Sequence, residues 1–126
     1  MKVITLKQPW ATLIAEGYKK YEFRTWKTNY RGKILIHAGC GIDKEAMMNF
    51  KDLDLSYPKS KILAEVDIVD CIKLNNEINK TIIEENEYIY VNNYNRCGYA
   101  WKLSNVKKLS IDKEVKGKLS IWDIDI

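Results

Sequence analysis

The sequence predicts a single α+β domain, built on a small, mostly antiparallel β-barrel with two or three short helices packed against it. Its 126 residues are the usual size of one domain and can bury one continuous core. The hydrophobic fraction of 46% and the charged fraction of 30% are typical of a folded globular chain. Strand-like segments outnumber helical ones and follow one another closely, whereas a parallel doubly wound sheet would need a helix after nearly every strand.

The first part of the chain predicts a strand, a short helix and a second strand. Residues 3–6 alternate apolar and polar side chains, which is typical of a strand. Residues 9–16 begin with a proline that suits a first helical turn, carry apolar side chains at helical spacing and are followed by a glycine. Residues 20–26 return to a period of two, with Tyr21 and Phe23 on the same face.

The middle of the chain predicts a buried strand followed by a helix. Residues 29–32 are turn-like, residues 33–38 are strongly apolar and predict a strand, and residues 39–41 predict a loop because two of the three are glycines. Asp43 is expected to cap a helix that runs to about Leu53, since a carboxylate before an apolar periodic segment is a typical helix start.

The last part of the chain predicts three more strands and an insertion. Residues 62–74 alternate over a long stretch and predict a long strand. Residues 75–95 are polar, acidic in the middle and rich in asparagine, so we expect an insertion or long loop with a helical part. Residues 99–103 and 119–124 predict two further strands.

Composition narrows the class of protein. The net charge of +4 and the pI near 8.9 permit binding to phosphate without requiring it. No apolar run approaches the length of a membrane helix, and the first residues do not resemble a secretion signal, so we expect a cytoplasmic protein without membrane contact. Cys40, Cys71 and Cys97 are widely spaced and predict three reduced thiols rather than disulfides or a metal site. No cofactor is expected.

One segment, residues 17–24, concentrates groups that suit ligand chemistry. In a strand Glu22, Arg24 and Trp26 share one face, and Lys19 lies at the corner before it. An arginine fork suits phosphate or a base edge, a carboxylate can accept hydrogen bonds from an amine or a ribose, and an indole can stack on a base. The alternative is a solvated face on which the carboxylate and guanidinium form a surface pair worth less than about 1 kcal/mol.

Other reactive residues give weaker indications. His37 is the single histidine and lies in an apolar strand, where it is either a hydrogen-bonded structural residue or a ligand contact at the strand end. A metal site or a histidine dyad is not expected, because the sequence has no second histidine. Cys40 follows closely in the chain, but no third group is evident that would orient a Cys–His pair.

Several motifs together resemble a known family, the ASCH (activating signal cointegrator homology) domain. The resemblance spans nearly the whole chain and implies a PUA-like β-barrel with a helix-flanked cleft that binds RNA or a nucleotide-like ligand. The motifs are Leu6-Lys7-Gln8-Pro9-Trp10-Ala11, Gly17-x-Lys19-x-x-Glu22-x-Arg24, Trp26, Tyr30-Arg31-Gly32, Ile36-His37-Ala38-Gly39, Ala64-Glu65-Val66, Tyr99-Ala100-Trp101 and Val115-Lys116-Gly117-Lys118-Leu119.

The resemblance also implies which residues line the cleft. The helix start and the glycine–lysine–glutamate–arginine motif are the expected lining, with strand-end residues as neighbours. Carried over to this sequence, the expected ligand-binding residues are Gln8, Pro9, Trp10, Lys19, Glu22 and Arg24, together with Trp26, His37, Tyr99 and Trp101.

Two alternatives to a binding module remain. Some relatives resemble small hydrolases that act on acetylated cytidine or on RNA, and Lys19 and Glu22 would then be the catalytic groups. The amidohydrolase pattern has a threonine near the position of Glu22, and Thr25 is one residue out of phase with that face. The other alternative is a protein-interaction role in which residues 75–95 form the contact surface.

Overall fold

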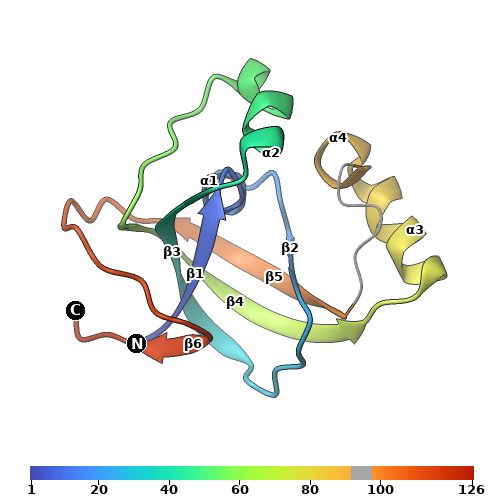
Figure 1. The fold of residues 1–126 in the computed structure, drawn as a ribbon. Coiled ribbons are helices and arrows are strands. Elements are labelled where there is room, and N and C mark those ends of the chain that lie inside the picture. Colours follow the sequence, from blue (N-terminus) through green and yellow to red (C-terminus); the bar gives the residue numbers. More distant parts are fainter. Residues whose placement is uncertain (92–97) are drawn as a thin grey trace.

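The computed structural model describes residues 1–91 and 98–126 (Figure 1). It is an α+β fold with one six-stranded sheet and several short helices. Among the described residues no helix combines the length and the apolar character needed to cross a membrane. The elements in chain order are β1 Lys2–Gln8, α1 Trp10–Ala15, β2 Tyr21–Arg24, β3 Gly32–Ile42, α2 Lys44–Asn49, the 3₁₀ helix η1 Lys51–Leu53, β4 Lys61–Lys73, α3 Asn76–Glu85, α4 Glu87–Tyr90, β5 Tyr99–Lys108 and β6 Ile121–Asp123.

The sheet has the strand order β2-β5-β4-β3-β1-β6. The pair β1 and β3 is parallel, and the other neighbouring pairs are antiparallel. A closed barrel is not confirmed, because β2 and β6 stand at the two ends of this order and the described strands form no closed ring of pairings. The sheet is nevertheless curved, since the side chain of Arg24 on β2 reaches the main-chain oxygen of Thr5 on β1 at 2.9 Å.

The first helix and the second strand form where the sequence predicts them. In α1 the amide of Leu13 donates to the carbonyl of Pro9, and Gly17 follows the helix with a positive φ of 84°. Only glycine adopts this backbone conformation without strain, which explains the end of the helix. The chain then turns directly into β2.

Strand β3 is longer than the sequence predicts. It continues through Gly39 and Gly41, where a loop was expected, and ends at Ile42. These glycines lie against side chains of β1: a Cβ on Gly39 would stand 2.8 Å from Thr5 Cγ2, and one on Gly41 would stand 3.1 Å from Lys7 Cγ. Their role is therefore close approach of two strands rather than a turn.

The remaining helices and strands are of the predicted type, but several are longer or shorter than predicted. The Asp43 carboxylate caps α2 by accepting from the amide of Ala46, as predicted. The helical part of the insertion is α3 and α4, capped by Asn75 and Asn86. The rest of that insertion, residues 92–95, and Cys97 lie outside the described residues. Strand β5 extends beyond the predicted range, and β6 is shorter than predicted.

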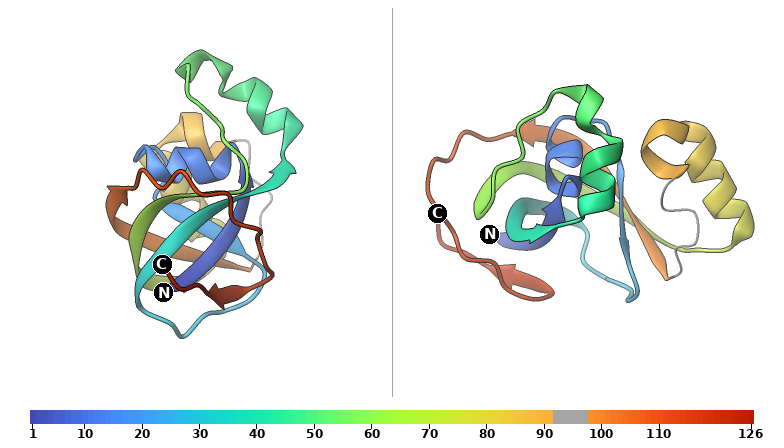
Figure 2. Two further views of the ribbon diagram at one scale, coloured as in Figure 1. Left: turned by 90° about the vertical axis from the view of Figure 1, so that its left-hand side faces the viewer. Right: turned by 45° about the horizontal axis from the view of Figure 1, so that its top comes forward.

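The core has two main parts that hold the helices on the sheet. One packs α1 against the inner face of the sheet and includes Ile14, Ile36 and Trp101. The other joins α1 to α2 and to the α3–α4 pair and includes Phe50 and Tyr90. As a result α3 and α4 stand at the side of the domain opposite β6 and the chain termini (Figure 2).

Candidate ligand-binding cleft

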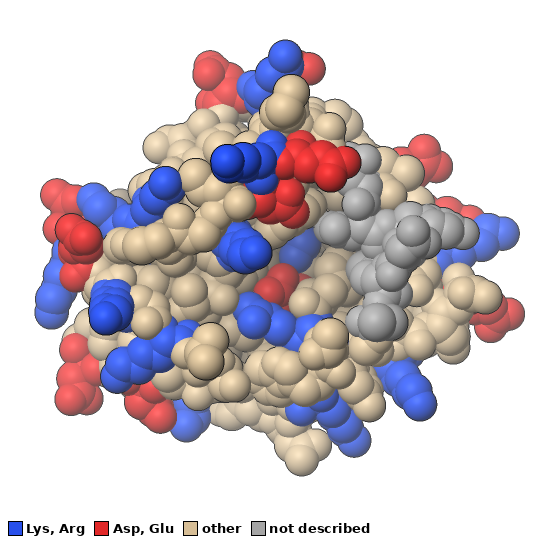
Figure 3. Space-filling view, viewed as in Figure 1, with Lys and Arg blue, Asp and Glu red and all other residues tan. Residues whose placement is uncertain are grey.

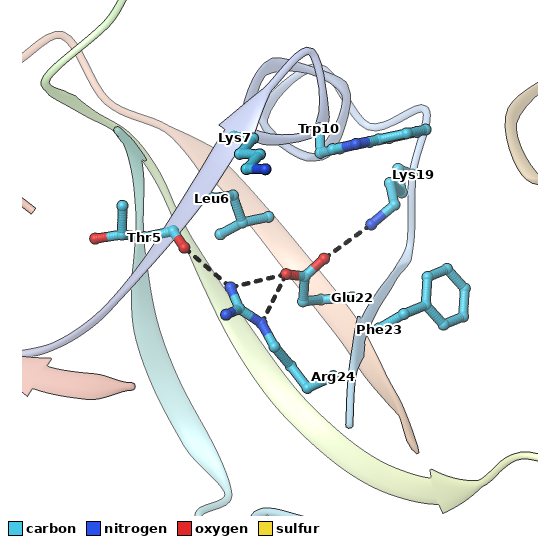
Figure 4. A pocket seen from close by; sticks show the side chains of 8 residues that line it. All are labelled: Thr5, Leu6, Lys7, Trp10, Lys19, Glu22, Phe23 and Arg24. Atoms are coloured by element: carbon cyan, nitrogen blue, oxygen red, sulfur yellow. Dashed lines mark hydrogen bonds and ion pairs between the residues drawn. The ribbon is translucent and has the colours of Figure 1, made fainter. Parts of the chain in front are cut away.

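A cavity of about 360 Å³ opens between β2, the last part of β1 and the start of α1 (Figure 4). Strand β6 pairs with β1 only from Lys2 to Ile4, and β2 pairs with β5. Beyond Ile4 the described part of β1 therefore has no strand neighbour on that side, and the cavity lies there, bordered by side chains. The lining residues are Thr5, Leu6, Lys7, Trp10, Lys19, Glu22, Phe23 and Arg24.

The Glu22 carboxylate links two cations inside the cleft. Lys19 Nζ lies 3.1 Å from Glu22 Oε1, while Arg24 Nε and Nη2 lie 3.0 and 2.9 Å from Glu22 Oε2. Arg24 Nη2 also donates to the Thr5 carbonyl at 2.9 Å. Figure 4 shows the two cationic side chains meeting the carboxylate from opposite sides. Charge-assisted hydrogen bonds of this kind hold side chains in one geometry.

Lys19 is an unusually buried lysine. Its side chain is 2% exposed, and its Nζ lies 5.4 Å from the centre of the Trp10 ring and 5.1 Å from the centre of the Phe23 ring. The turn after α1 brings it there, because the amides of Tyr18 and Lys19 both donate to the carbonyl of Leu13. The carboxylate and the aromatic faces together stabilise the buried ammonium.

The balance of polar groups in the cleft favours a ligand that accepts hydrogen bonds. Both oxygens of Glu22 are engaged by cations. Arg24 Nη1 makes no hydrogen bond to any residue that the structure describes, and Lys7 contributes a further exposed cation to the lining. In the space-filling view, Lys and Arg side chains lie around a hollow near the centre of this face, with acidic side chains inside it and along its upper edge (Figure 3). The site therefore suits an anionic or carbonyl-rich group.

The structure brings together four of the residues that the sequence singles out: Trp10, Lys19, Glu22 and Arg24. Thr5, Leu6 and Lys7, the three residues before the Gln-Pro-Trp motif, also line the cleft and were not predicted there. Phe23 lines it too, although it was expected on the opposite face of its strand. Lys19 folds back between the Phe23 ring and the Trp10 ring, so the short strand presents both faces to the cleft.

Gln8 and Pro9 are buried and do not line the cleft. The Gln8 side chain accepts from the amide of Thr12 at 3.0 Å and donates to the Thr12 hydroxyl and to the Pro58 carbonyl, each at 2.8 Å. These bonds fasten the start of α1 to the segment before β4. The expectation that Gln8 faces a ligand is corrected, because its polar atoms point into the protein.

The expected aromatic neighbours also lie outside the lining. Trp26 packs edge-on against Trp101, with ring centres 4.8 Å apart, and Trp101 is buried in the core. Tyr99 is half-buried and packs against the same core. Since directly opposed residues of an antiparallel pair share a face, Trp101 lies beside Glu22 and Tyr99 lies beside Arg24. These three rings support the cleft without lining it.

His37 is fully buried in a hydrogen-bonded network away from the cleft. Its Nε2 lies 2.6 Å from the carbonyl of Val115 and must donate, so in the neutral ring Nδ1 accepts from the Thr5 hydroxyl at 3.1 Å. That hydroxyl in turn accepts from the indole of Trp122 at 3.1 Å. Burial lowers the pKa of His37, which keeps the ring neutral. This geometry fits a hydrogen-bonded structural role for His37 rather than a ligand contact at the strand end.

Comparison with known proteins identifies the family. The family model described as the ASCH domain matches residues 4–112, which include every residue that lines the cleft. The chain belongs to the ASCH domain family.

Two curated relatives of this ASCH domain carry the same printed name. The chain is 26% identical over 136 aligned positions to activating signal cointegrator 1 of Homo sapiens, and 25% identical over 135 positions to the protein of that name in Mus musculus. Each alignment covers 97% of this chain and 22% of the relative. The chain thus spans about a fifth of the length of these relatives.

Proposed function

We propose that this ASCH domain binds single-stranded RNA, or a nucleotide-like ligand, in the cleft between β1 and β2. The observation that carries the proposal is the chain of ion pairs that joins the buried Lys19 and Glu22 to the partly exposed Arg24, beside the Trp10 ring. A cleft of this volume lies within the range of about 300–1,000 Å³ that is usual for ligand sites.

Each part of the cleft has a counterpart in a nucleotide. The Nη1 group of Arg24 and the ammonium of Lys7 can contact phosphate oxygens. The partly exposed Trp10 ring and the Phe23 ring can stack on a base, an interaction that tolerates any sequence. Glu22 then acts by positioning the two cations, and the ligand does not need to contact it.

The relatives support the direction of this proposal but not its details. Their name, activating signal cointegrator 1, describes a protein that acts together with other factors on an activating signal. A module that holds RNA is compatible with such work. The name gives no ligand, so the proposal rests on the cleft.

The proposal is tested by comparing two arginine variants in an RNA titration. Fluorescein-labelled oligouridine is titrated at several salt concentrations, and its anisotropy is measured. Arg24→Ala should weaken binding about tenfold or more and reduce the salt slope by about one. Arg31→Ala is the matched control, because Arg31 is exposed, does not line the cleft, and lies 3.9 Å from Asp70. Equal affinity of wild type and Arg24→Ala would reject the site.

A hydrolase is the second candidate function, favoured by the contact between Lys19 and Glu22 in the cleft. A buried lysine next to a carboxylate can exchange a proton with a substrate. Thr5 lines the cleft, but its hydroxyl points away and bonds to His37 and Trp122, so it is not placed as a nucleophile. Incubation with N4-acetylcytidine and with single-stranded RNA, followed by mass spectrometry, tests this function; a product that Lys19→Ala abolishes would establish it.

A further inference from the structure

A second cavity, of about 320 Å³, lies on the other side of the turn that follows α1. The turn sends Lys19 into the cleft and leaves Tyr18 and Lys20 on this second cavity, so the two sites are back to back. The far wall is made by the α3–α4 pair. The lining residues of this tyrosine groove are Gly17, Tyr18, Lys20, Tyr21, Glu85, Asn86 and Tyr90.

The tyrosine groove has a firm aromatic base. The rings of Tyr21 and Tyr90 are nearly perpendicular, with centres 5.9 Å apart, and both side chains are buried. The hydroxyl of Tyr90 accepts from the amide of Lys20 at 2.7 Å. Burial and the nearby Glu85 carboxylate raise the pKa of Tyr21, so its phenol stays protonated. Tyr18, which is 40% exposed, stands at the edge of the groove.

The charge around the tyrosine groove is opposite to that of the cleft. The segment of residues 75–91 carries several glutamates and a single lysine, although the whole chain has a net charge of +4. Glu85 is exposed and lies in the groove itself, at the end of α3, and the exposed Lys20 is the one cation among the described lining residues. With Lys20 counted, the groove and this segment together carry four glutamates and two lysines, so their charge is still negative. This negative field repels a phosphate backbone and attracts cations. The glutamates are Glu77, Glu84, Glu85 and Glu87, and the lysine is Lys80.

We propose that the tyrosine groove binds a basic segment of a partner protein, with one Lys or Arg side chain beside the exposed Tyr18 ring and its charged end on Glu85. Tyrosine faces attract cations, and a carboxylate at the end of an aromatic groove fixes the position of the charge. The acidic segment thus contributes Glu85, Asn86 and Tyr90 to the groove. The site is separate from the proposed RNA cleft, and its existence does not depend on RNA binding.

The test uses a fluorescein-labelled ten-residue peptide in which Lys and Arg alternate with Gly and Ser, and a control peptide in which Gln replaces every Lys and Arg. Wild type should bind the basic peptide and not the control peptide. Glu85→Gln and Tyr18→Ala should each weaken binding about fivefold or more, since each removes one part of a cation site. Glu77→Gln makes the same change of charge in the same segment outside the groove, and should change affinity less than about twofold.

Three results would overturn the proposal. The first is no binding of the basic peptide to wild type. The second is equal weakening by Glu85→Gln and Glu77→Gln, which would indicate only diffuse attraction to an acidic surface. A loss of oligouridine affinity in Glu85→Gln would instead make the groove part of an RNA path. Arg24→Ala serves as the reverse control, because it should leave peptide binding unchanged while it weakens RNA binding.

Discussion

Replacing Glu22 by glutamine tests the charge arrangement of the cleft. Lys19 and Arg24 each carry one positive charge and Glu22 one negative charge, so the three side chains sum to +1 and the variant leaves +2. The Lys19 and Glu22 side chains are only 2% and 11% exposed, whereas Arg24 is 24% exposed. Removing one partner of a fully buried pair costs about 3–5 kcal/mol. With the screening that Arg24 receives from water, we expect a loss of about 2–4 kcal/mol in the free energy of unfolding.

The same substitution should act on ligand binding in the opposite direction. Per folded molecule, oligouridine affinity should stay equal or rise, because the cleft gains positive charge and Glu22 is not needed as a ligand contact. Urea unfolding and RNA anisotropy measure the two effects, with Glu65→Gln as control, since Glu65 faces a largely exposed Lys33 at 3.8 Å. The reasoning is refuted if Glu22→Gln unfolds like wild type, or if its folded form loses RNA affinity tenfold.

Three further predictions concern stability. Burial holds the pKa of His37 below its usual 6.5, so the free energy of unfolding should fall as the pH drops below about 6.5, by up to about 1.4 kcal/mol per pH unit. Urea titrations between pH 5 and 8 should show this slope in wild type and not in His37→Gln. Gly98→Ala should lower the free energy of unfolding by at least about 2 kcal/mol more than Gly17→Ala, as measured by thermal unfolding. Both glycines have a positive φ, but a Cβ on Gly98 would stand 2.5 Å from a main-chain oxygen, whereas one on Gly17 would meet nothing within 4 Å. Equal losses in the two variants would contradict this packing. Gln8→Ala should lower the free energy of unfolding by about 2–4 kcal/mol and keep oligouridine affinity within twofold, because the Gln8 side chain makes three hydrogen bonds inside the protein. A loss of affinity without a loss of stability would instead indicate that Gln8 contacts the ligand.

Local patterns predicted most elements of the fold. The period of two identified the strands, and Asp43 identified the start of α2. The error at residues 39–41 arose because glycine signals both a turn and a close approach of strands, and only the position of Thr5 distinguishes them. The parallel pairing of β1 and β3 joins segments about thirty residues apart, and no local pattern specifies such a partner.

Only the part of the candidate site that depends on local structure could be predicted from the sequence. The spacing of Lys19, Glu22 and Arg24 placed them together correctly, since a turn and a short strand are local structures. The expectation that Gln8 and Trp101 line the cleft came from the family resemblance, and their burial depends on distant segments that cover them. The contact between Arg24 and the Thr5 carbonyl likewise follows from the curvature of the whole sheet.

Photocross-linking tests the central claim most directly. Single-stranded RNA that contains 5-iodouridine is irradiated with the wild-type domain, and the linked peptide is identified by mass spectrometry. The cleft predicts cross-links to Trp10 or Phe23, the aromatic rings of its lining. Cross-links confined to Tyr18 or Trp122, which do not line the cleft, would contradict it.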